Sequence, residues 1–188
     1  LLARRDSEQH MQEAAQHGIK LIDLVVVNLY EFEKTVANPE VTFADAIEHI
    51  DIGGPSVLRS AAKNAASVTV ISDPADYDAV LAEMRETGGC TTLSTRRRLQ
   101  VKVYQTTAAY DTAISRWLAA QASDVADTSA KLEISLEKVD DLRYGENPQQ
   151  KATVYRFAEG CENTASSQFP LVGSEQIQGK PLSYNNYL

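Results

Sequence analysis

The first third of the chain alternates between stretches with helical spacing of apolar residues and one almost continuous apolar run. Residues 7–17 have the helical spacing, Ser7 is a suitable N-cap, and Gly18 stands where helices often end. Residues 19–27 are mostly apolar, which is typical of a strand buried on both faces of a parallel sheet. The pattern therefore predicts a helix followed by an interior strand.

Helical and strand-like stretches continue to alternate through the next part of the chain. The predicted elements are helices over 43–50, 55–66 and 74–86, a strand over 68–71, and a long helix from Ser94 or Thr95 to about Ala122. The apolar residues that should form the buried face of the long helix are Leu99, Val103, Tyr110, Ile114, Trp117 and Leu118. The expected fold class is therefore α/β, with a parallel sheet flanked by helices.

The composition changes after the long helix. Residues 123–130 are small and polar, as in a linker. Beyond them, residues 132–136 alternate between apolar and polar, and residues 154–157 are rich in β-branched and aromatic side chains, so both are strand candidates. We therefore expect two regions, 1–130 and 131–188.

The composition argues against several classes of function. The 188 residues are 43% hydrophobic, enough for a real core, and 26 acidic against 18 basic residues give a net charge of −8. Nucleic-acid binding needs a basic stripe and is therefore not expected. The two cysteines, Cys90 and Cys161, and the three scattered histidines lack the spacing of a metal site, so no metal is expected and a reducing, cytoplasmic setting is the default.

The ends of the sequence and its hydropathy add two expectations. No stretch is apolar over the length of a membrane helix and no signal peptide is visible, so no membrane association is expected. The chain begins without Met and stops abruptly, which suggests a fragment of a longer protein.

Three polar residues stand where an α/β protein places its chemistry. Tyr30 follows the first apolar run, and Asp51 and Lys63 bracket a Gly-Gly-Pro turn and the helix after it. Ligands of open parallel sheets bind beyond the carboxyl ends of the strands and at helix N-termini. A phenol, a carboxylate and an ammonium that share one small cavity there could move protons and hold an oxyanion.

Each of these residues also has an ordinary structural explanation. A lysine on a helix is usually solvated, a carboxylate before Gly-Gly usually belongs to a turn, and a tyrosine after a strand is usually core or rim. The turn at Gly53 and Gly54 could bind an anion and Arg143 could bind a phosphate, but such loops are common without ligands. Spacing alone favours the structural explanations.

Five segments that occur in order carry a family resemblance. They are Asn28-Leu29-Tyr30, Ile50 to Gly54, Ala61 to Asn64, Leu142 to Pro148, and Leu182 to Asn186. Together they resemble the bifunctional purine biosynthesis family that joins IMP cyclohydrolase to AICAR transformylase. The resemblance covers the whole chain. It implies the later part of a methylglyoxal-synthase-like cyclohydrolase domain over 1–130, and over 131–188 the N-terminal beginning of a transformylase half with a cytidine-deaminase-like fold.

The resemblance also implies an activity. The family transfers a formyl group from 10-formyltetrahydrofolate to AICAR and then closes the ring of the product, with loss of water, to give IMP. A phosphate-binding portion and one catalytic Lys of the cyclohydrolase should precede Leu1, and the transformylase His with its neighbouring Lys should follow Leu188. A homodimer that binds these purine nucleotide intermediates is expected, and the isolated chain could be inactive.

Site residues carry over from the matching motifs. The implied catalytic residues are Tyr30, Asp51 and Lys63. Asp51 would orient the attacking amide and take its proton, while the other two would donate to the developing oxyanion. The residues implied to bind substrate are Asn28, Gly53, Gly54, Arg143, Tyr144 and Asn186.

Two positions depart from the family pattern. Glu31 stands where the family usually has Pro after Asn-Leu-Tyr, and because proline would stiffen that turn, we expect Tyr30 to be held less firmly. Gln149 stands where the family usually has His, and a glutamine side chain cannot carry a proton at neutral pH.

Two other classes of function remain open. Methylglyoxal-synthase-like domains also serve as regulatory modules that sense phosphorylated or nucleotide ligands, and such a module would not need Tyr30, Asp51 and Lys63 together. Alternatively, the long helix over 95–122 could be mainly a dimer surface of an inactive fragment.

Overall fold

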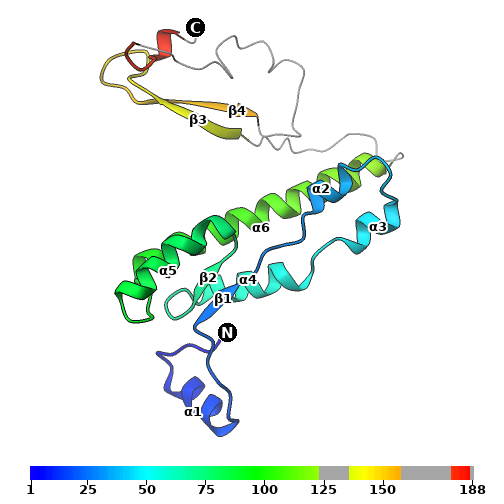
Figure 1. Ribbon diagram of the computed structural model, residues 1–188, viewed down its shortest axis with the longest axis vertical. Helices are drawn as coiled ribbons and strands as arrows, with labels where there is room; N and C mark the ends of the chain where they lie inside the picture. Colours follow the sequence, from blue (N-terminus) through cyan, green and yellow to red (C-terminus); the bar gives the residue numbers. More distant parts are fainter. Residues whose placement is uncertain (123–135, 158–178, 187–188) are drawn as a thin grey trace. The chain divides into compact units, whose positions relative to one another are not determined.

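The computed structural model describes residues 1–122, 136–157 and 179–186. Contacts between residues divide the chain into two compact units, Leu1–Ala126 and Asp127–Leu188. The first unit combines helices with a small parallel sheet, and the second contains an antiparallel hairpin (Figure 1).

The first unit runs from a short N-terminal helix to a helix of 29 residues (Figure 1). Its elements in chain order are α1 (Glu8–Gln16), β1 (Leu24–Val26), α2 (Phe32–Val36), α3 (Phe43–Glu48), α4 (Gly53–Lys63), β2 (Thr69–Ile71), the 3₁₀ turn η1 (Pro74–Asp76), α5 (Tyr77–Glu86) and α6 (Leu93–Gln121). Side-chain N-caps explain three of the helix starts, because Ser7, Thr42 and Thr92 each accept a backbone N–H. The predicted mixed α/β class is confirmed for this unit.

The sheet is smaller than the hydrophobic pattern predicted. β1 and β2 pair in parallel, with Leu24 opposite Thr69. The prediction of a strand over 19–27 buried on both faces is wrong, because only three of these residues form the strand and Val25 alone among those three is buried. α4 and α6 cover β2, so all of β2 is buried. Within the described residues no helix covers β1 comparably, and Leu24 and Val26 are exposed.

A core of small and branched side chains joins α4, β2 and α6. Its buried residues are Val25, Leu58, Ala61, Ala62, Val68, Val70 and Val103. A smaller core of Ile71, Val80 and Leu99 joins β2, α5 and α6. α6 therefore contributes to both cores, and it packs against α4, β2 and α2.

An aromatic cluster joins the later part of α6 to the segment that follows β1. Phe32, at the start of α2, is 1% exposed and packs edge-on against Tyr110 and Trp117, with ring centroids 6.4 and 5.8 Å apart. Phe43 stacks on Trp117 at 5.5 Å. Because Phe32 lies two residues after Tyr30, this cluster positions the chain that carries Tyr30.

An ion-pair cluster joins the carboxyl end of β2 to α6. Asp76, with 8% of its side chain exposed, pairs with Arg98 at 2.7 Å and with Lys102 at 2.5 Å, and Lys102 also pairs with Asp73 at 2.7 Å. Burial of Asp76 opposes its charge, but the hydrogen bonds from Arg98 and Lys102 outweigh it and hold its pKa below the ordinary value. The cluster therefore fixes the start of α5, where Tyr77 lies.

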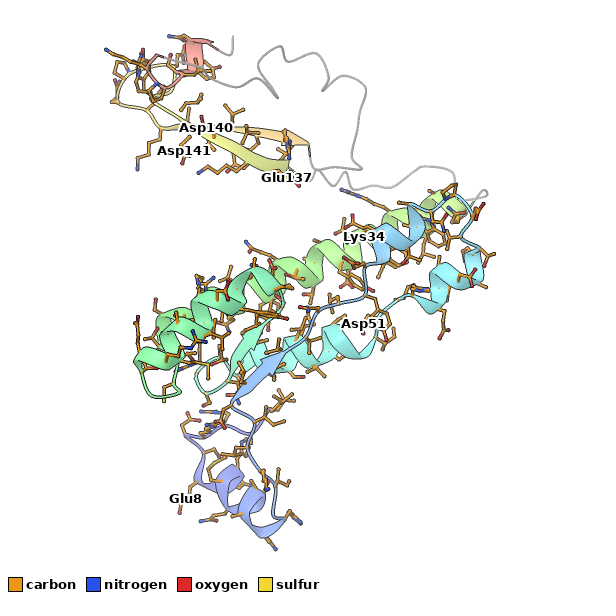
Figure 2. The ribbon with its side chains drawn as sticks, in the orientation of Figure 1. Glu8, Lys34, Asp51, Glu137, Asp140 and Asp141 are labelled. Carbon is orange, nitrogen blue, oxygen red and sulfur yellow. The ribbon has the colours of Figure 1, made fainter. Side chains whose placement is uncertain are left out.

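The second unit contains the hairpin of β3 (Leu136–Leu142) and β4 (Ala152–Phe157), and the turn η3 (Tyr184–Asn186). The strands pair antiparallel, which confirms the strand predicted over 154–157. Figure 2 shows the acidic side chains Glu137, Asp140 and Asp141 along β3. The predicted linker over 123–130 lies outside the described residues, as does most of the alternating stretch over 132–136.

Two negative findings apply to the described ranges. None of their helices, the 29-residue α6 included, combines the length and the apolarity that a membrane span requires. Nor do these ranges contain a group of three or more His, Cys, Asp or Glu side chains that could hold a metal ion.

The aromatic cluster yields a stability prediction. Replacing the buried Phe32 (Phe32→Ala) should lower the free energy of unfolding by about 3–5 kcal/mol, because a fully buried ring leaves a cavity. Phe43 is 55% exposed, so Phe43→Ala should cost only about 1 kcal/mol. Urea unfolding followed by Trp117 fluorescence measures both. Equal losses for the two variants would contradict the packing described above.

Candidate active site

Asp51 lies two residues before Gly53, the first residue of α4, and its side chain caps the first turn of that helix (Figure 2). Its Oδ1 accepts the Gly54 N–H at 2.7 Å, so the carboxylate satisfies one of the free N–H groups of the first turn and lies at the positive end of the helix dipole. Its Oδ2 makes no hydrogen bond within the described part of the chain, and the residue is half-buried. One oxygen therefore fixes the orientation of the carboxylate, and the other is open to accept a proton.

The main chain of Asp51 is held from α6. The Asp51 N–H donates to Tyr110 Oη at 2.8 Å, and Tyr110 Oη donates to the His49 carbonyl at 3.4 Å. Burial raises the pKa of the Tyr110 phenol; the hydrogen bond from the Asp51 N–H opposes this in part, and the nearby carboxylates of Asp51 and Asp111 raise the pKa further. The sequence pattern placed Tyr110 on the buried face of the long helix, and no sequence signal marked it as a partner of Asp51.

Gly54 lies close to both the Asp51 carboxylate and Leu29, which is in the loop after β1. A Cβ added to Gly54 would lie 2.4 Å from Asp51 Oδ2 and 2.8 Å from Leu29 Cδ2. A Cβ added to Gly53 would meet nothing within 4 Å. The glycine at position 54 is therefore required by close packing. It lets both Asp51 and Leu29, the residue before Tyr30, lie close to the start of α4.

Tyr30 presents its phenol to solvent. The residue is 57% exposed, and the hydroxyl makes no hydrogen bond within the described ranges. The Phe32 N–H donates to the Tyr30 carbonyl at 2.9 Å across Glu31, whose φ of −80° and ψ of 65° form an inverse γ-turn. That φ lies in the range a proline would impose. The backbone therefore gives no support to the expectation that Glu31 loosens Tyr30.

Lys63 lies at the opposite end of α4. It is the last residue of the helix and is exposed. A rise of 1.5 Å per residue places it roughly 15 Å from Gly53 along the helix axis. The expectation that Tyr30, Asp51 and Lys63 share one cavity therefore does not hold in this structure, which brings only Tyr30 and Asp51 to the Tyr110 end of α4. A lysine in the last turn has an ordinary explanation, its attraction to the helix dipole.

Asn28 is held by the first residue of α5. Its side-chain Nδ2 lies 3.0 Å from Tyr77 Oη, and its Oδ1 lies 3.3 Å from the same hydroxyl. Asn28 is exposed and follows β1 by two residues, so its amide lies beyond the carboxyl end of that strand. Sequence reasoning did not identify Tyr77, because nothing in the local pattern links positions 49 residues apart.

A second cluster lies in the hairpin unit, around Arg143 and Tyr144. The Arg143 guanidinium lies 4.7 Å from the centre of the Tyr144 ring and donates to Tyr144 Oη at 3.0 Å. A hydrogen bond with Ser183, and then Arg143, lowers the pKa of the Tyr144 phenol. Two backbone hydrogen bonds, Arg143 N–H to the Leu182 carbonyl and Tyr184 N–H to the Tyr144 carbonyl, attach this cluster to residues 182–184.

The remaining predicted contacts of this unit are less defined. Asn186 ends η3, and its side chain lies outside the described residues. Gln149 is exposed in the loop after Tyr144, but its neighbour Gln150 holds that loop together. Gln150 accepts the Gly145 N–H with its carbonyl and the Asn147 N–H with its side chain, both at 2.9 Å.

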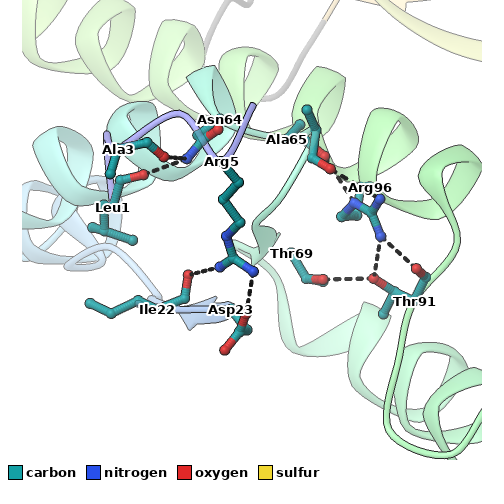
Figure 3. Close-up of polar contacts among 11 residues, drawn as sticks. Leu1, Ala3, Arg5, Ile22, Asp23, Asn64, Ala65, Thr69, Thr91 and Arg96 are labelled. Carbon is teal, nitrogen blue, oxygen red and sulfur yellow. Dashed lines mark hydrogen bonds and ion pairs between the residues drawn. The ribbon is translucent and has the colours of Figure 1, made fainter. Parts of the chain in front are cut away.

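A cavity of about 410 Å³ lies at the amino ends of β1 and β2. Figure 3 shows the polar contacts of residues around it. Arg5 and Arg96 line it. Arg5 pairs with Asp23 at 2.7 Å and donates to the Ile22 carbonyl at 3.1 Å, and Arg96 donates to the carbonyls of three residues. Those three residues are Ala65, Ala66 and Thr91. Because both guanidinium groups are engaged with the chain itself, this cavity is a weaker candidate than the Asp51 region.

A hollow of about 540 Å³ lies between α2 and α3. Its lining includes Glu31, which follows Tyr30, and His49, whose carbonyl accepts from Tyr110. Neither of these two spaces is lined by Tyr30, Asp51 or Lys63.

Comparison with known families identifies the family of this chain. A family model described as AICARFT/IMPCHase bienzyme matches residues 61–188, more than half of the chain. The chain belongs to this bienzyme family. The model of the MGS-like domain matches residues 3–56, so an MGS-like domain is followed here by the AICARFT region. The matches confirm the resemblance seen in the five sequence segments.

Curated relatives of the bienzyme match along the entire chain. The bifunctional purine biosynthesis protein PurH of Bacillus cytotoxicus is 55% identical over 186 residues, and that of Chlorobium chlorochromatii is 51% identical over 188. These alignments cover 99% and 100% of this chain but 35% of each relative, so the chain spans about a third of their length. A solved structure described as "Crystal structure of ForH" is 35% identical with a TM-score of 0.58, over 65% of this chain and 63% of that one.

The close packing at Gly54 predicts opposite effects for two neighbouring substitutions. Gly54→Ala should lower the free energy of unfolding by about 1–3 kcal/mol, because the new methyl group must displace the Asp51 carboxylate or Leu29. Gly53→Ala meets open space in a helix and should raise it by up to about 1 kcal/mol. Urea unfolding of the two variants tests this. Equal effects would show that Gly54 is not in close contact.

Proposed function

We propose that this chain carries part of an IMP cyclohydrolase site, around Asp51, and the beginning of an AICAR transformylase domain. The bienzyme would catalyse the last two steps of purine nucleotide synthesis: formyl transfer from 10-formyltetrahydrofolate to AICAR, and dehydrative closure of formyl-AICAR to IMP. The observation that carries the proposal is the Asp51 carboxylate, anchored by Oδ1 and open at Oδ2, at the same end of α4 as the exposed Tyr30 phenol.

Ring closure needs a base beside the attacking nitrogen. The carboxamide nitrogen of formyl-AICAR forms a bond to the formyl carbon, and the formyl C–O bond then breaks. The oxygen leaves as water, with one proton from the carboxamide nitrogen and one from the formamido nitrogen. An amide nitrogen is a poor nucleophile, so a positioned acceptor for its proton lowers the barrier. Asp51 Oδ2 would be that acceptor, and the bond from Gly54 to Oδ1 would keep it aimed.

The formyl oxygen gains negative charge as the bond forms. Tyr30 would donate its hydroxyl to this oxygen, since that hydroxyl has no other partner in the described part of the chain. Asn28, fixed by Tyr77, would bind the nucleotide at the same strand end, and the turn at Gly53 and Gly54 would contact it at the start of α4. The catalytic role of Lys63 stays a prediction from the resemblance. Lys63 takes no part in the mechanism proposed here, because it lies at the C-terminal end of α4, away from Asp51.

The hairpin unit would supply nucleotide contacts of the transformylase half, for which the family implies a cytidine-deaminase-like fold. A guanidinium has five N–H donors in a geometry that matches phosphate, and Arg143 uses one of its donors on Tyr144. Arg143 and Tyr144 would therefore contact the AICAR nucleotide, with Asn186 as a further contact. The family also implies a homodimer and a folate co-substrate.

The role of Asp51 can be tested in a full-length PurH whose matching segment is replaced by residues 1–188. Asp51→Asn keeps an oxygen that can cap α4 but cannot take a proton, so ring closure should slow by about 100-fold or more. Formyl transfer should be nearly unchanged. Asp45→Asn is the matched control, because the Asp45 side chain accepts the Thr42 N–H in the capping box at the start of α3. Normal ring closure by Asp51→Asn would remove Asp51 from the mechanism, and IMP binding without turnover by the unsubstituted protein would indicate a regulatory module.

Arg143 should show the converse pattern in the same protein. Arg143→Ala should raise the KM for AICAR by about 10-fold or more, since a charged contact contributes roughly 1.5–3 kcal/mol, and should leave ring closure unchanged. Arg156→Ala is the control, because Arg156 pairs with Glu137 on the same hairpin. Steady-state kinetics of both half-reactions measures this. A parallel fall of both activities would indicate misfolding in place of a lost contact.

A further inference from the structure

The Tyr110 side chain contacts both chain segments that form the Asp51 site. The hydroxyl accepts the N–H of Asp51, 59 residues away in sequence, and donates to the carbonyl of His49, 61 residues away. The ring of the same tyrosine packs edge-on against Phe32, two residues after Tyr30. One side chain of α6 therefore contacts the turn that carries Asp51 and the segment that carries Tyr30.

We propose that Tyr110 is a positioning residue that holds Asp51 in its reactive orientation. This inference rests on the proposed function of Asp51. The hydroxyl fixes the Asp51 main chain through its N–H, and Gly54 fixes the Asp51 side chain through Oδ1. Because the main chain and Oδ1 are both held, the carboxylate cannot rotate freely, and Oδ2 keeps one direction. Without the hydroxyl, the Asp51 N–H and the His49 carbonyl lose their shared partner.

The surroundings of Tyr110 suit this role. Burial and the nearby carboxylates of Asp51 and Asp111 raise the pKa of the phenol, so it stays protonated and remains a donor to His49. Phe32 and the helix hold the ring, so the hydroxyl is presented from a rigid surface. A loosened carboxylate would still cap α4 part of the time, which predicts a slower reaction in a folded protein.

The test uses the full-length PurH that carries residues 1–188. Tyr110→Phe keeps the ring and removes only the hydroxyl, so kcat for ring closure should fall by about 10- to 100-fold, the scale expected for a misplaced reacting group. The KM for formyl-AICAR and the rate of formyl transfer should change by less than about 3-fold. The matched control is Tyr104→Phe on the same helix, whose ring lies 5.4 Å from Arg59 and whose hydroxyl has no partner in the described ranges. It should react like the unsubstituted protein.

A double variant separates positioning from general destabilisation. If Tyr110 acts through Asp51, adding Tyr110→Phe to Asp51→Asn should slow ring closure by less than about 3-fold further, because the carboxylate it orients is already gone. A further fall as large as that of Tyr110→Phe alone would overturn the proposal. So would equal rates for Tyr110→Phe and Tyr104→Phe while Asp51→Asn is slow. Rapid ring closure by Asp51→Asn itself would instead overturn the proposed function.

Discussion

The hydrogen bond from the Gly54 N–H to Asp51 Oδ1 is the constraint on which the candidate site depends. It makes one carboxylate both the cap of α4 and, in the function proposed above, the proton acceptor at the end of the sheet where ligands of α/β proteins bind. The absence of a side chain at position 54 lets both Leu29 and that carboxylate come close to the backbone at this position. The same hydrogen bond thus caps the helix and orients the carboxylate for its proposed role.

The turn that carries Asp51 and the segments near it are held in place by α6. α6 supplies Tyr110 to the turn, Trp117 to the aromatic cluster with Phe32, and Lys102 and Arg98 to the acidic groups at the end of β2. These contacts come from one rigid helix, so the segments after β1, before α4 and after β2 are held relative to one another. The three segments around the candidate site are therefore all positioned by contacts with α6.

Local signals in the sequence were enough to predict most helices. Caps such as Ser7 and Asp73, and Gly18 at a φ of 62°, mark element ends through interactions within a few residues. The sequence pattern did not predict α2 and overextended β1, because burial of an apolar run depends on which elements cover it. Lys63 shows a related limit. The motif that contains it favoured a shared site with Asp51, but the straight helix between them separates the two residues. Contacts such as Asn28 with Tyr77 and Asp51 with Tyr110 join distant positions and leave no local pattern.

The most direct test of this account is a crystal structure of a full-length PurH that carries residues 1–188, bound to a formyl-AICAR analogue. The account predicts that Asp51 Oδ2 lies within about 2.6–3.2 Å of the carboxamide nitrogen, with the Tyr30 hydroxyl on the formyl oxygen. A nucleotide bound instead in the cavity beside Arg5 and Arg96, with Asp51 contacting only Gly54, would contradict it.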